Sequence, residues 1–107
     1  MKRLLKHINH IKLLGHCDDK LRRAILKNSD KELIVCLCEC VLNFLSGNLK
    51  TGDTETKKLE SYKNTLRQLI LSKGSVSSKR NILVQKGGFL PFIIPAIIDL
   101  TSRLLNQ

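Results

Sequence analysis

The chain has 107 residues, enough for one small domain, and its 42% hydrophobic residues allow a modest core. Nineteen Lys and Arg against nine Asp and Glu give a formal net charge of +10, which indicates an anionic partner, either nucleic acid or an acidic membrane surface. Five of the nine acids lie in residues 29–56, between two basic stretches, so the composition excludes a uniformly charged, disordered polycation.

The first two predicted helices are short and amphipathic. One spans Lys2–Leu14 and ends at Gly15, and its apolar stripe consists of Leu4, Leu5, Ile8 and Ile11. The second spans Lys20–Lys27, with Asp18 or Asp19 as its N-cap, and we expect three residues to face inward: Leu21, Ala24 and Ile25.

The third predicted helix, at about residues 30–46, has the clearest start. Ser29-Asp30-Lys31-Glu32 fits a capping box, in which the serine caps the helix and the glutamate bonds back to it. The sequence that follows, ELIVCLCECVLNFLSG, is apolar on nearly every face, and Gly47 is the expected stop. A short helix that is apolar all round belongs in the centre of a bundle.

The fourth predicted helix spans Glu55–Ser72, and Gly74 ends it. Its apolar residues step by three and four: Leu59, Tyr62, Leu66, Leu69 and Ile70. After it, Ser77 or Ser78 could cap one or two further helical turns.

The last segment is neutral and apolar. Gly87 to Ile98 contains no charge, but these twelve residues are too few to span a bilayer, which takes about 20. Pro91 fits the first turn of a helix, and Pro95 would kink or restart it. Packing in the core and lying on a bilayer surface both remain open.

Together these segments predict an all-α protein. We expect a small bundle of four to five short helices around a central apolar helix (about 30–46), with an apolar C-terminal helix or tail. Residues 1–86 would form a basic helical domain, and the apolar segment 87–107 would pack on the same domain.

The cysteines do not indicate a disulfide framework, because three of the four lie within Cys36–Cys40 in an apolar run. Cys36 and Cys40 share a helix face and Cys38 points away, so core packing is favoured over a zinc site. Met1–Gly15 lacks the uninterrupted apolar stretch of a secretory signal, and we expect a reducing compartment. We predict no metal and no cofactor.

The sequence contains no nucleophile elbow, P-loop, paired acid motif or His–Glu metal motif, and we predict a protein that is not an enzyme. The basic stretch after residue 56 is more informative, because Glu60 is its one acid before residue 87. A one-sign surface fits phosphate contacts, and the scarcity of aromatics disfavours base stacking. We therefore predict sequence-tolerant, salt-sensitive binding to double-stranded DNA through Lys57, Lys58, Lys63, Arg67, Lys73, Lys79, Arg80 and Lys86.

Two resemblances bear on function. The stretch QKGGFLPFIIPAII resembles the end of the precursor of adenovirus core protein X, the mu peptide, in which a basic segment runs into Gly-Gly and an apolar tail with prolines. The blocks LRRAILKNSDKELIVCLCECVLNFLSGNL and VSSKRNILVQKGGFLP, in that order, resemble small basic late proteins of Maverick/Polinton elements and adintoviruses.

These resemblances imply a nucleic-acid-associated core or packaging protein of an adenovirus-related element. It would be located in the virion, and in the host nucleus or cytoplasm during assembly, and it would not be secreted. By position they also imply a proteolytic processing site at Gly87, Gly88 and Phe89, with the cut after Gly88. Where the adenovirus-type site has Met, Ile or Leu, this chain has Gln85.

An alternative function rests on the apolar tail. Residues 89–105 could bind a capsid protein or a membrane surface, which would make the chain a membrane-active or capsid-binding helical protein. An exposed apolar tail would also favour self-association, so a homo-oligomer is an open alternative.

Overall fold

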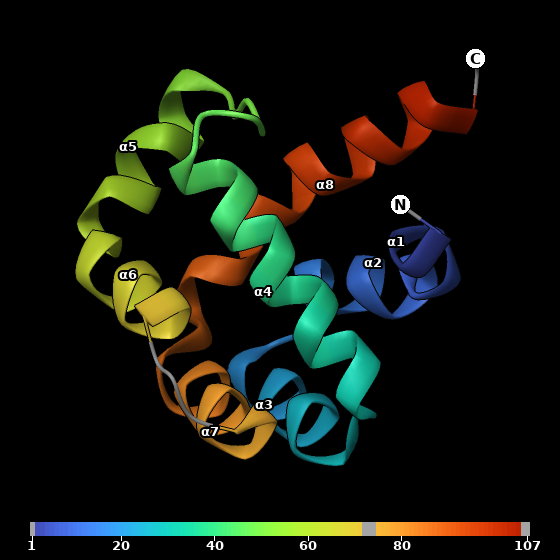
Figure 1. Cartoon of the computed structure of the whole chain (residues 1–107), viewed down its shortest axis with the longest axis vertical. Coiled ribbons are helices and arrows are strands. Elements are labelled where there is room, and N and C mark those ends of the chain that lie inside the picture. The colour runs from blue at the N-terminus through green and yellow to red at the C-terminus, as the bar shows by residue number, and fades with distance from the viewer. Residues whose placement is uncertain (1, 72–74, 106–107) are drawn as a thin grey trace.

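The computed structural model describes residues 2–71 and 75–105 of the chain. Every regular element in these two ranges is helical, which confirms the predicted fold class. The helices form a bundle measuring 35 × 27 × 27 Å, and the apolar helix α4 (Lys31–Leu45) crosses its middle (Figure 1).

The first predicted helix is divided by a turn at His7 into α1 (Lys2–Lys6) and α2 (Ile8–His16). The His7 ring is buried, and its Nε2 lies 3.3 Å from a Glu32 carboxylate oxygen at the start of α4. Gly15 does not end the helix, contrary to the prediction. A Cβ at Gly15 would lie 2.8 Å from Ile94 Cγ2, so the glycine instead lets α2 pack closely on the C-terminal helix.

Aspartates cap the next two helices. Asp18 accepts a hydrogen bond from the Leu21 amide at the start of α3 (Asp19–Asn28), at 2.8 Å. Asp30 accepts one from the Leu33 amide at the start of α4, at 3.0 Å. The predicted Ser29–Glu32 capping box is therefore wrong. The Ser29 hydroxyl donates to the Leu26 carbonyl, and Glu32 pairs with Lys6 and His7 instead.

The inward face of α3 also differs from the prediction. Arg22 and Leu26 are buried and Ile25 is half-buried, whereas Leu21 and Ala24 are exposed. The face that packs is the one that meets α7 (Val76–Lys86), a helix far away in sequence, and the local apolar pattern of α3 does not reveal it.

Helix α4 occupies the centre, as predicted. Its buried side chains lie on most of its circumference: Leu33, Ile34, Cys36, Leu37, Cys38, Cys40 and Val41. Phe44 is only half-buried, because it lies in the last turn. Gly47 follows in the left-handed region with a φ of 80°, which is the conformation that ends many helices.

The fourth predicted helix is likewise two helices, α5 (Asp53–Ser61) and α6 (Lys63–Leu71), joined by a turn at Tyr62. Leu59, Leu66 and Leu69 are buried, as their spacing predicts. Ser75 rather than Ser77 or Ser78 precedes α7, which is eleven residues long instead of one or two turns. The predicted stop at Gly74 lies outside the described residues.

The apolar C-terminal segment lies in the core. A short 3-10 turn, η1 (Gly87–Phe89), leads into α8 (Leu90–Leu105), which packs most extensively on α2. Pro91 lies in its first turn, and Pro95 lies inside the helix without ending it. Its inward residues are almost completely buried: Phe89, Leu90, Ile93, Ile94 and Ile97.

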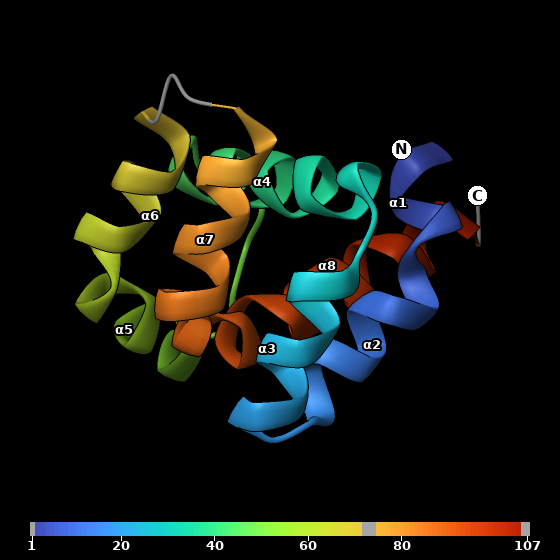
Figure 2. The ribbon, with the colours of Figure 1, turned by 90° about the horizontal axis from the view of Figure 1, so that it is seen from below.

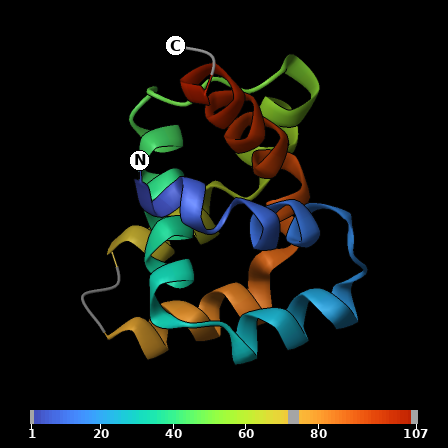
Figure 3. The ribbon, with the colours of Figure 1, turned by 90° about the vertical axis from the view of Figure 1, so that its right-hand side faces the viewer.

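Three helices from distant parts of the chain form one layer. Helix α7 contacts α3 on one side and α6 on the other, and it also contacts α4 beneath (Figure 2). Figure 3 shows α3 and α7 running side by side along one edge of the bundle, away from α1 and α8. This arrangement decides where the positive charge of the chain is displayed.

Candidate nucleic-acid interface

The layer of α3, α7 and α6 carries most of the net positive charge. These helices contain nine Lys and Arg and one acid, Asp19, which amounts to a formal +8 of the +10 of the whole chain. A surface that serves only solubility normally mixes both signs. A surface of one sign suits contacts with phosphate groups, which need positive charge without base recognition.

The packing of the layer explains why these cations reach solvent. Leu26, Leu66, Leu69 and Leu83 are fully buried, so each of the three helices turns an apolar side toward the core. Six of the nine cations are exposed, and we refer to them as the basic face: Lys20, Arg23, Lys27, Lys63, Arg67 and Lys86. Those on α3 step by three and four residues, so they share one side of that helix.

The predicted DNA-binding residues lie on three different helices. Lys57 and Lys58 are exposed on α5, outside the layer, and Lys63 and Arg67 are exposed on α6. The remaining three with a described position, Lys79, Arg80 and Lys86, lie on α7. Lys73 lies outside the described residues. The predicted stretch is thus a bent path across α5, α6 and α7.

Two of these cations hold the protein together. Arg80 Nη1 donates to the Leu26 and Ser29 carbonyl oxygens, each at 2.7 Å, and contacts Ser29 Oγ at 2.9 Å. Lys79 Nζ donates to the Leu69 carbonyl oxygen at 2.9 Å, near the end of α6. These carbonyls lie at helix C-termini, where they lack partners within the helix. Arg80 and Lys79 therefore tie α7 to both of its neighbours.

Sequence reasoning missed the contribution of α3. Lys20, Arg23 and Lys27 complete the basic face because α3 packs beside α7, which is more than fifty positions later in the chain. Their helical spacing was visible in the sequence as a signal. Their position beside α7 follows only from the tertiary packing.

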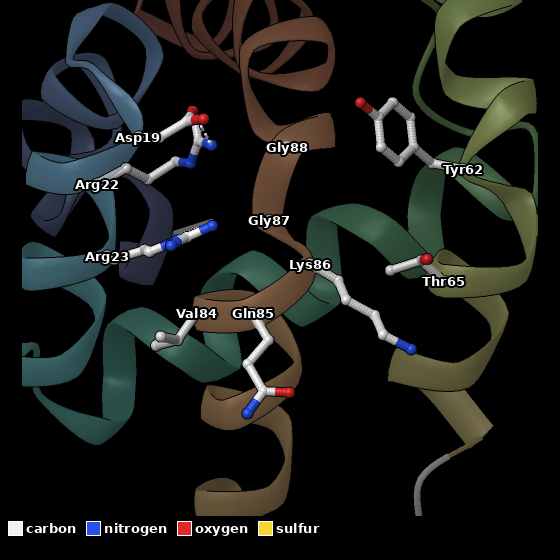
Figure 4. Close-up of a pocket in the computed structure, with 10 residues that line it drawn as sticks. All are labelled: Asp19, Arg22, Arg23, Tyr62, Thr65, Val84, Gln85, Lys86, Gly87 and Gly88. Carbon is white, nitrogen blue, oxygen red and sulfur yellow. Dashed lines mark hydrogen bonds and ion pairs between the residues drawn. The ribbon is translucent and has the colours of Figure 1, made fainter.

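A cleft opens in the layer where α7 ends (Figure 4). It has a volume of about 310 Å³. Its α3 wall carries Asp19, Arg22 and Arg23, its opposite wall carries Tyr62 and Thr65, and the chain from Val84 to Gly88 runs between the walls. The cleft therefore combines three cationic groups, Lys86 included, with one carboxylate and two hydroxyl groups.

The basic side chains of the cleft are held differently. Arg22 is buried, with 6% of its surface exposed, and its Nη2 donates to Asp19 Oδ1 at 2.5 Å. Lys86 Nζ lies 3.3 Å from Gln68 Oε1 and is open to solvent. Arg23 is exposed and has no ion-pair partner within residues 2–71 and 75–105. The position of Arg22 is therefore fixed before any ligand arrives, while the charges of Arg23 and Lys86 are not neutralised by an ion pair among the described residues.

The predicted processing site lies at the same place. Gly87 is buried, the backbone from Gly87 to Phe89 forms a 3-10 turn, and Phe89 is completely buried. A protease needs an extended, accessible segment, so the folded chain does not present the Gly88–Phe89 bond in a cleavable form. Cleavage would require local unfolding, because the bond lies in the 3-10 turn and the Phe89 side chain is packed in the core. Processing after Gly88 stays a prediction.

The cysteines lie in the core. Burial raises the pKa of the Cys38 thiol. A hydrogen bond with Cys36, together with burial, raises the pKa of Cys40. Protonated thiols are poor nucleophiles and poor metal ligands. Within the described part of the chain, no three His, Cys, Asp or Glu side chains are grouped so that they could hold a metal ion.

One stretch, Val76–Arg103, is long and apolar enough to cross a membrane by length and composition, with a mean hydropathy of 1.5 in its most apolar window. In the fold this stretch is not one straight helix, because η1 separates α7 from α8 and the two point in different directions (Figure 1). The core buries part of the second half, namely Leu90, Ile93, Ile94 and Ile97, whereas Phe92, Ile98 and Leu100 are half-buried.

Comparison of the chain with protein-family profiles, with curated proteins and with solved structures returned no match.

Proposed function

We propose that this protein binds nucleic acid through phosphate contacts made by the basic face, without catalysis and without strong sequence preference. The observation that carries the proposal is the nine-to-one excess of basic over acidic residues in the layer of α3, α7 and α6. Such a surface attracts any polyphosphate backbone, and releases its condensed counterions on binding.

The size of the protein suits duplex DNA. Its long axis is 35 Å, which is about one turn of B-DNA. Lysine and arginine contacts to phosphates along one side of the duplex would position the protein without reading the bases. The chain has one Tyr, three Phe and no Trp, so it has few side chains for stacking on unpaired bases.

The biological setting that we propose is DNA packaging in the virion of an adenovirus-related element. The ordered sequence blocks that resemble Polinton and adintovirus late proteins support this setting. Arg23 and Lys27, two cations of the basic face, fall within the first of these blocks. The alternative, a membrane-active or capsid-binding role of residues 89–105, would have to use the half-buried side chains of Phe92, Ile98 and Leu100 and the exposed Leu105, because the core buries the other large apolar side chains of described position in this segment.

The test compares two double variants with equal loss of charge. Lys63→Gln/Arg67→Gln removes two exposed cations of the basic face, and Lys12→Gln/Lys50→Gln removes two exposed cations outside it. Affinity for a random-sequence duplex is measured by fluorescence anisotropy over a salt series. We expect the first variant to bind more weakly and to lower the salt slope by about 1.8, because each lost phosphate contact lowers it by about 0.9.

The control variant should keep the slope of the unmodified protein. An equal loss in both variants would show that binding depends on total charge and not on this face. Two duplexes of unrelated sequence should bind within a few-fold of each other. A strong preference for one of them would contradict binding through phosphates alone.

A further inference from the structure

The two glycines that line the cleft are not required by the backbone. The φ of Gly87 is −77°, and among the described residues the positive-φ glycine is Gly47. A side chain at position 87 or 88 would therefore meet no conformational barrier. A glycine that the backbone does not require often leaves room for the close approach of another group.

The two glycines face different surroundings. A Cβ at Gly87 would lie 3.6 Å from Leu90 Cδ1, 3.8 Å from Leu26 Cδ1 and 3.9 Å from Arg22 Nε, whereas a Cβ at Gly88 would lie 3.3 Å from the Tyr62 hydroxyl oxygen. Gly87 is therefore packed against the core beside Arg22, and Gly88 keeps the space beside the tyrosine hydroxyl open (Figure 4). The bare backbone runs between groups that donate hydrogen bonds.

We infer that this cleft is a binding site for a single phosphate group. Arg23 and Lys86 supply charge from opposite sides, Arg22 is held in place by Asp19, and the hydroxyls of Tyr62 and Thr65 supply further donors. Arginine forks match phosphate oxygens in geometry as well as in charge. The inference rests on the proposed function in one respect, the molecule to which the phosphate belongs. That molecule would be a nucleic acid, and the bound group would be a phosphodiester of its backbone.

The site extends the proposed function, because it would hold one phosphate of the backbone at a defined position on the basic face. Exposed lysines hold phosphates loosely and let a protein slide along a duplex. A cleft that receives one phosphate between two walls would set the register of the protein on the strand. Phosphate contacts fix position and orientation without reading sequence.

The chain carries its own reporter for this site. Tyr62 is the one tyrosine, and there is no tryptophan, so intrinsic fluorescence comes from the cleft wall. The full-length protein is titrated with inorganic phosphate and, separately, with dimethyl phosphate as a stand-in for the backbone diester. Chloride keeps the ionic strength constant. We expect saturable changes in Tyr62 fluorescence with both probes, and no saturable change with chloride alone.

Three variants give the test its specificity. Arg23→Gln should weaken phosphate binding about tenfold, the usual effect of losing one charge-assisted hydrogen bond. Lys12→Gln removes the same charge outside both the cleft and the basic face, and should bind like the unmodified protein. Gly88→Ala places a Cβ 3.3 Å from the Tyr62 hydroxyl oxygen and should bind severalfold more weakly, because it narrows the cleft beside that hydroxyl.

The outcomes separate this inference from the proposed function. If the Tyr62 fluorescence change saturates with inorganic phosphate but not with dimethyl phosphate, the phosphate site stands and binds terminal or free phosphate. If the fluorescence change saturates with neither probe, or if Arg23→Gln and Lys12→Gln bind phosphate equally well, the phosphate site is overturned even if duplex DNA binds through Lys63 and Arg67. If the fluorescence change saturates with the phosphate probes but the protein binds no duplex DNA, the proposed function is overturned and the phosphate site stands.

Discussion

Arg80 and Arg67 carry the same charge and have opposite environments. Arg67 is exposed on α6, whereas Arg80 is half-buried and donates to the carbonyl oxygens that end α3. A charge count treats the two alike, and for that reason the sequence predicted both as phosphate ligands. What distinguishes them is the position of α3 beside α7, which no local pattern specifies.

Replacing Arg80 with Ala should therefore destabilise the fold and leave DNA binding nearly intact. The loss should be about 1–3 kcal/mol, because the Leu26 and Ser29 carbonyl oxygens would lose a charged donor. Urea unfolding followed by circular dichroism measures this loss. Arg67→Ala is the matched control, with unchanged stability and weaker DNA binding. The reverse pattern would return Arg80 to the interface.

Glu32 makes the stability of the fold depend on pH. Its carboxylate accepts a hydrogen bond from Lys6 at 2.9 Å and lies 3.3 Å from His7, and these contacts hold its pKa below the ordinary value of 4.5. A lowered folded-state pKa contributes stability that is present above pH 4.5 and is lost as the pH falls through the lowered value.

Glu32→Gln should consequently be slightly less stable than the unmodified protein at pH 7, and the difference should vanish in acid. The effect is small because the pair is exposed. Urea midpoints at pH 7, 4.5 and 3 measure it, with Glu60→Gln as an exposed control that has no ion pair among the described residues. A difference that stays the same at all three pH values would contradict the assignment.

At the scale of elements, the core depends on the C-terminal segment of η1 and α8 more than the sequence suggested. Phe89, the last residue of η1, is 0% exposed, and its ring centroid lies 6.2 Å from that of Tyr62, whereas Phe44 of the central helix is only half-buried. Phe89→Ala should cost about 3–5 kcal/mol in unfolding free energy, the usual range for a buried phenylalanine. Phe44→Ala should cost clearly less. Chemical denaturation of both variants tests the order, and a larger cost at Phe44 would show that the C-terminal segment is not central.

Several elements could be predicted from periodicity, caps and composition. The all-helical class, the central position of α4 and the inward leucines of α5 and α6 follow from local patterns. The interruptions could not be predicted. The turns at His7 and Tyr62 occur inside continuous helical patterns. Gly15 lies inside a helix because a side chain at this position would clash with Ile94 of α8. These features are decided by contacts between distant segments.

At the scale of the whole molecule, the candidate interface is a product of topology. Its cations come from residues 20–27, 63–67 and 86, which the bundle brings into one layer. The sequence identified the second half of this set and missed the first. The resemblance implied a processing site at Gly87, Gly88 and Phe89, and the structure places these residues in a 3-10 turn whose two glycines line the cleft.

The salt dependence of duplex binding tests the central claim most directly. With the six cations of the basic face in contact with phosphates, the slope of log K against log salt should be about −5, and affinity for random-sequence DNA should fall about 10³-fold between 50 and 200 mM salt. Fluorescence anisotropy with the full-length protein measures this slope. A slope near zero, or no binding at 50 mM salt, would contradict the account and remove nucleic acid as the partner of this surface.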